Sequence, residues 1–102
     1  MKAFLIDPLA KTIREIEIAG HEDELRSLIE AKHIEYDDIS QTTDRLCFDE
    51  DCFISQKPGR FQLDTLAPVA GKALVLGGLS ASGAVLDASI SLGELEARIK
   101  FI

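Results

Sequence analysis

The sequence predicts an α+β fold, with a mainly antiparallel sheet built from hairpins in a single globular domain over residues 1–102. Three observations lead to this prediction. Short β-branched and apolar runs alternate with turn residues, which is typical of hairpins. Only one internal segment, residues 22–32, has helical apolar spacing. No strand–helix–strand alternation of the kind that builds a parallel sheet is present. With 102 residues, 46% of them hydrophobic, the chain is long enough to bury a core.

The first two predicted strands form a hairpin. Residues 2–7 (KAFLID) end at the turn-initiating pair Asp7-Pro8, and residues 12–18 (TIREIEI) are rich in β-branched side chains. The pair therefore predicts an antiparallel start to the sheet.

Residues 22–32 predict an amphipathic helix. Its apolar side chains recur at helical spacing at Leu25, Leu28 and Ile29. Its first turn is acidic, which the helix dipole favours, with carboxylates at Glu22, Asp23 and Glu24.

The middle of the chain predicts a strand and two further hairpins. Residues 33–39 (HIEYDDI) read as a strand, and residues 44–56 (DRLCFDEDCFISQ) as a hairpin with the acidic residues 49–51 at its tip. Pro58-Gly59 suits a type II turn, so residues 56–64 predict another hairpin with Phe61 and Leu63 facing inward. The segment that follows, LAPVAG, is expected to be a connecting loop.

A glycine-rich loop joins the last two predicted strands, residues 72–78 (KALVLGG) and 83–89 (GAVLDAS). Gly78 and Gly83 have the spacing of a phosphate-binding loop. The two positions after Gly83, which such a loop fills with Lys and Ser or Thr, hold Ala84 and Val85. The loop is therefore predicted to be a turn and not a phosphate site.

The C-terminal segment fits two structures. Leu92, Leu95, Ile99 and Ile102 recur as on a helix face, whereas Leu95, Ala97, Ile99 and Phe101 alternate as in a strand. Ser91 followed by Glu94 forms a capping box, which favours a short helix over about 92–100.

Most of the net charge of −7 falls in one stretch. Residues 35–51 contain seven carboxylates and one arginine, which gives this stretch a net charge of −6. They are Glu35, Asp37, Asp38, Asp44, Asp49, Glu50 and Asp51. This balance argues against direct nucleic-acid binding, which needs basic side chains to neutralise phosphates. It favours attraction of a basic protein surface.

Metal and cofactor sites lack a supporting pattern. Cys47 and Cys52 are too widely spaced for a zinc knuckle, and His21 and His33 lie about three helical turns apart at the two ends of the predicted helix. No metal and no cofactor is therefore expected. The spacing leaves a Cys47–Cys52 disulfide open beside the default of two reduced thiols.

No catalytic motif accompanies the carboxylates. The calcium-loop pattern is absent, and Ser80 and Ser82 lie outside a nucleophile-elbow frame. We therefore expect a non-enzymatic acidic module that binds a basic protein, in its strongest form by mimicking nucleic acid. The alternatives are a small metal- or ligand-dependent enzyme using the acidic cluster, and a structural or assembly protein that pairs with itself as a homo-oligomer.

The layout of these segments resembles a diffuse class of small uncharacterised proteins of bacteriophages and other mobile elements. The resemblance rests on the order of MKAFLIDP, IREIEI, CFDEDCFI, FQLD, PVAGKALVLGG and SLGELEARIKFI. It implies a phage or bacterial cytoplasmic setting and no transferable functional residue. A cytoplasmic location also agrees with the lack of a secretory signal or of an apolar run near the roughly 18 residues of a membrane span.

Overall fold

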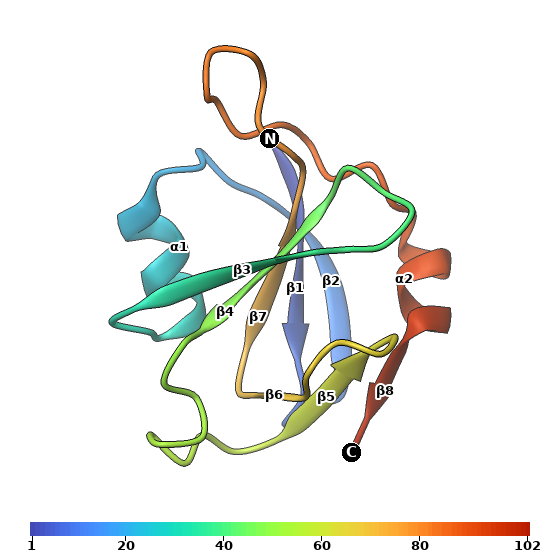
Figure 1. The fold of residues 1–102 in the computed structure, drawn as a ribbon. Helices are drawn as coiled ribbons and strands as arrows, with labels where there is room; N and C mark the ends of the chain where they lie inside the picture. Colours follow the sequence, from blue (N-terminus) through green and yellow to red (C-terminus); the bar gives the residue numbers. More distant parts are fainter.

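The computed structural model describes residues 1–102 and confirms the α+β class, with two short helices and eight strands in antiparallel sheets (Figure 1). The larger sheet has five strands in the order β2-β1-β7-β4-β3. Its strands are β2 (Thr12–Glu17), β1 (Lys2–Asp7), β7 (Ala73–Leu76), β4 (Arg45–Asp49) and β3 (Ile34–Asp38). The smaller sheet has the order β6-β5-β8, formed by β6 (Val69–Ala70), β5 (Arg60–Leu63) and β8 (Ile99–Phe101).

Both faces of the five-stranded sheet are covered. Leu25 and Ile29 of α1 (Glu22–Ile29) pack on one face against Leu5 and Leu74. The other face meets the smaller sheet and α2 (Leu92–Arg98) in a second cluster. That cluster includes Phe4, Ile6, Val75, Phe61, Leu63 and Leu95. Neighbouring residues of β1 and β7 point to opposite faces, so both strands need unbroken apolar runs.

The predicted hairpin over residues 2–18 is confirmed, since β1 and β2 pair from Lys2↔Glu17 to Asp7↔Thr12. The predicted helix 22–32 is three residues too long. It ends at Ile29 because Glu30 takes a left-handed backbone conformation (φ 56°). At its other end Glu24 reaches back to accept hydrogen bonds from the backbone N–H groups of Ala19 and Gly20.

The C-terminal segment uses both of the periodicities read from the sequence, one after the other. Ser91 caps α2 as predicted, its side chain accepting a hydrogen bond from Glu94 N at 3.2 Å. The helix ends at Arg98, before the predicted residue 100, because Ile99 becomes extended and pairs with Leu63 of β5.

The predicted hairpin over residues 44–56 is wrong. β4 pairs with β3, from Asp38↔Arg45 to Ile34↔Asp49, so the hairpin turn lies at residues 39–44. After Asp49 the chain leaves the sheet through consecutive turns at residues 50–56. Cys47 and Cys52 therefore lie in different core clusters, and both are free thiols.

Pro58-Gly59 does not form the predicted hairpin turn. It leads into β5, whose Phe61 and Leu63 are buried as expected. Gly59 has a positive φ of 77°, and a Cβ there would lie 2.5 Å from the backbone N of Leu9. Glycine is thus required where this segment crosses the turn between β1 and β2. The predicted connecting loop that follows contains β6.

The glycine-rich segment is a turn, as predicted, but its second arm is not a strand. Leu79 and Val85 form one isolated bridge, and Gly77 N and Leu86 N donate to Leu86 O and Gly78 O. In Figure 1 this loop projects beside the N-terminus. Only β7 of the two predicted strands belongs to the sheet.

Candidate interaction surface

β3 is the outer strand of the five-stranded sheet and has only β4 beside it (Figure 1). Glu50 N donates to His33 O and Ile39 N donates to Asp44 O, each at 3.1 Å. Residues alternate in the direction of their backbone groups along an antiparallel strand. The N–H and C=O groups of the even-numbered residues of β3 therefore point away from the sheet. These residues are Ile34, Tyr36 and Asp38.

The seven carboxylates predicted as a binding site do not form one surface. Asp44 and Asp49 are buried, with 1% and 3% of their surface exposed. The other five, Glu35, Asp37, Asp38, Glu50 and Asp51, are exposed or half-buried. Two members of the predicted set therefore lie inside the protein and cannot face a partner.

Asp44 holds the segment before α2 against the end of the β3–β4 hairpin. Its carboxylate accepts hydrogen bonds from the backbone N–H groups of Ser89 and Ile90 and from the Ser89 hydroxyl, at 2.8–3.0 Å. These bonds compensate the burial of a charge, which would otherwise be costly. Its role is structural.

Asp49 forms a buried ion pair with Lys57, with Oδ2 2.9 Å from Nζ. Its Oδ1 accepts a hydrogen bond from Asp51 N, which starts the turns after β4. The role of Lys57 could not be predicted from the sequence, because the groups that it contacts belong to β4 and to the end of α1. Asp49 is therefore neutralised inside the fold.

Asp51 is hydrogen-bonded, since its Oδ2 lies 3.1 Å from His33 Nδ1, a contact that is an ion pair only when the imidazole is protonated. Four of the predicted carboxylates remain, and none of them is in any ion pair of the structure. We call these four the acidic edge: Glu35, Asp37 and Asp38 on β3, with Glu50 beside the start of β3.

Arg45, the one basic residue in the acidic stretch, lies opposite Asp38 in the β3–β4 register but forms no ion pair with the acidic edge. Its guanidinium lies 4.6 Å from the centre of the Tyr36 ring, and its Nε donates to Gly77 O. Tyr36 is 38% exposed, and partial burial raises the pKa of its phenol. The edge thus presents unpaired carboxylates beside an aromatic ring.

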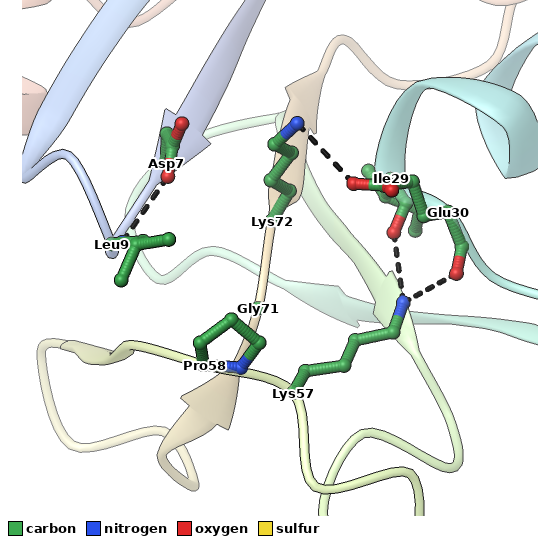
Figure 2. A pocket seen from close by; sticks show the side chains of 8 residues that line it. All are labelled: Asp7, Leu9, Ile29, Glu30, Lys57, Pro58, Gly71 and Lys72. Carbon is green, nitrogen blue, oxygen red and sulfur yellow. Dashed lines mark hydrogen bonds and ion pairs between the residues drawn. The ribbon is translucent and has the colours of Figure 1, made fainter.

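The hollows of the surface lie elsewhere. One of about 430 Å³ lies between the end of α1 and the β1–β2 turn (Figure 2). Lys57 points from it to the carbonyl groups of Ile29 and Glu30, and Lys72 Nζ lies 3.3 Å from a Glu30 carboxylate oxygen. Both ammonium groups in this hollow are already engaged by the protein.

A second hollow, of about 530 Å³, includes Asp49 and Asp51 in its lining. Both carboxylates have basic partners, in Lys57 and His33. No group of three or more His, Cys, Asp or Glu side chains is placed to hold a metal ion. Neither helix has the length and apolarity that crossing a membrane requires.

The geometry thus separates the acidic stretch into two buried structural carboxylates, Asp51 in contact with His33, and the acidic edge on and beside β3, which forms no ion pair. Comparison with known proteins adds no relative to this description. No family model, no curated protein and no solved structure matches the chain.

Proposed function

We propose that this protein is a binding module whose acidic edge engages a basic surface of a partner protein. One observation carries the proposal: four carboxylates that form no ion pair lie on the outer strand β3 or beside its start. Unpaired charges of one sign attract a surface of opposite sign and speed its encounter.

A basic protein suits this edge better than nucleic acid does. Nucleic-acid binding requires Lys and Arg side chains that neutralise the phosphates, whereas the carboxylates of the acidic edge would repel the phosphates. In the stronger form of the proposal, the row of carboxylates competes with nucleic acid for the same basic protein.

The enzyme alternative has less support. The acidic edge follows a strand on the surface, whereas the two predicted carboxylates that line a hollow, Asp49 and Asp51, are held by Lys57 and His33. A general acid or base must reach a substrate proton, which a carboxylate engaged by its own fold does less readily.

The proposal is tested by measuring the affinity of a fluorescent lysine-rich peptide at low and high salt. We expect binding that weakens as salt rises, because contacts between exposed charges are screened. The triple variant Glu35→Gln/Asp37→Asn/Asp38→Asn should bind about tenfold more weakly at low salt.

A matched control removes three carboxylates from other surfaces, in Glu15→Gln/Glu94→Gln/Glu96→Gln. This variant has the same net charge as the first and should bind nearly as the wild type does. Equal losses in the two variants would show attraction to the overall charge only, and would refute the acidic edge as a binding surface.

A further inference from the structure

The backbone of β3 offers hydrogen-bonding groups that the fold leaves unused. The odd-numbered residues of this segment bond toward β4, as the bonds of His33 O and Ile39 N show. Because the direction alternates along the strand, the N–H and C=O groups of Ile34, Tyr36 and Asp38 point away from β4. An open sheet edge of this kind is a template for another strand.

The side chains of β3 determine which strand can pair there. Glu35 and Asp37 share one face, opposite Phe48 and Leu46 of β4. Tyr36, between them in the sequence, points to the other face of the sheet, where its cross-strand partner on β4 is Cys47. A strand complementary to this pattern has basic residues at every second position, with apolar residues between them.

A second copy of the chain is a poor match for this edge. Antiparallel pairing of β3 with itself, centred on Tyr36, would place Glu35 opposite Asp37 of the other copy and Asp37 opposite its Glu35. Like charges directly opposite one another in a sheet are destabilising. Acidic residues on an edge strand therefore oppose self-pairing while they leave it open to a basic strand.

We propose that the partner binds as an added antiparallel β-strand along β3, through an extended segment with Lys or Arg at alternate positions. This inference rests on the function proposed above and specifies the partner's form. Apolar residues of the added strand lie opposite Tyr36 and exchange backbone hydrogen bonds with it. Basic residues lie opposite Glu35 and Asp37, in the pairs without hydrogen bonds, where facing side chains are closer.

The test uses a capped seven-residue peptide of alternating Val and Lys, with Val at both ends. Two methylated forms of it are matched controls of equal charge. Methylation of the Val amides removes the donors that face β3 in the proposed register, and methylation of the Lys amides removes those on the far side. We expect about tenfold weaker binding for the first form and little change for the second.

Amide hydrogen exchange of the protein provides the second measurement. With the unmodified peptide bound, the amides of Ile34, Tyr36 and Asp38 should exchange at least several-fold more slowly. The amides of Glu35 and Asp37, which already face β4, serve as internal references and should change little.

The outcomes separate this inference from the proposed function. Suppose both methylated peptides bind equally and the outward amides are unprotected, while neutralising Glu35 and Asp37 still weakens binding. Strand addition would then be refuted and the proposed function retained. If neutralising those two carboxylates left binding unchanged, both strand addition and the proposed function would be refuted. Dimerisation through β3 without peptide, detected by light scattering, would overturn the inference in favour of a second copy.

Discussion

Lys57 Nζ lies 2.9 Å from Asp49 Oδ2, and the same ammonium group donates to the carbonyl oxygens of Ile29 and Glu30. One side chain thus joins the end of β4, the end of α1 and the turns between β4 and β5. Its three donors match its three acceptors, and only 15% of the side chain is exposed.

Replacing Lys57 with Met should destabilise the protein severely. The substitution leaves the buried Asp49 carboxylate without its basic partner and removes the donor from the last carbonyls of α1. Loss of one member of a buried ion pair costs about 3–5 kcal/mol. Urea unfolding of the variant and the wild type measures the difference.

The matched control is Lys72→Met, which removes a lysine from the more exposed pair with Glu30. Pairs of this kind contribute about 0–1 kcal/mol. If the two variants lost the same stability, the bridging role of Lys57 would be wrong.

Asp44→Ala should also destabilise the fold, although its charge in the sequence looks like a surface charge. The substitution removes the acceptor of the buried N–H group of Ile90 and of the part-buried N–H group of Ser89, and a buried group left unsatisfied costs about 1–3 kcal/mol. The control Asp38→Ala, on the exposed edge, should stay within about 0.5 kcal/mol of the wild type. Thermal and urea unfolding would contradict this account if the two variants were equally stable.

The ion pair of Asp64 with Arg98 should make stability depend on pH in the acidic range. The Arg98 side chain holds the pKa of Asp64 below its usual value by hydrogen bonding to it. Its contribution is therefore present above the unfolded pKa of about 3.9 and is lost as pH falls through the lower folded pKa. The variant Asp64→Asn should be less stable than the wild type at pH 7, with the difference shrinking toward pH 3.

Asn is the appropriate replacement, because Asp64 has a positive φ of 51° and Asn tolerates that conformation. Unfolding measured at several pH values gives the comparison. A gap between the two proteins that is constant from pH 7 to pH 3 would be inconsistent with the pair.

Both thiols should resist modification in the folded protein. Burial raises the pKa of Cys47 to about 12, so its reactive thiolate is only on the order of 10⁻⁴ of the total at pH 8. Cys52 is 4% exposed and packs in the other core cluster. A thiol reagent should therefore label two cysteines quickly in urea and neither under native conditions. Rapid native labelling of Cys47 would disprove its burial.

Elements fixed by local interactions could be predicted from the sequence. The hairpin of β1 and β2 follows from a turn and two adjacent β-branched runs, and the start of α2 from the cap at Ser91. The run through Cys47 and Phe48 also predicts a strand, which the structure confirms as β4. The strand that pairs with β4 could not be predicted, because the segments before and after it in the sequence were equally plausible partners. The structure pairs it with the earlier segment, β3.

The candidate site could be predicted only in part for a related reason. A carboxylate in the sequence carries no sign of whether distant donors will surround it. Asp44 finds its donors at Ser89 and Ile90, and Asp49 finds Lys57, through contacts made only by the folded chain. Glu35 and Asp37 differ from them by lying on an edge strand, which depends on the order of strands in the sheet.

The most direct test of the acidic edge is to map, by NMR, where a lysine-rich peptide perturbs the amide signals of the labelled protein. We expect the largest shift changes at residues 34–38 and at Glu50, and we expect these changes to fade as salt is added. Changes centred on β2 or on the loop at residues 79–86, with residues 34–38 unaffected, would contradict it.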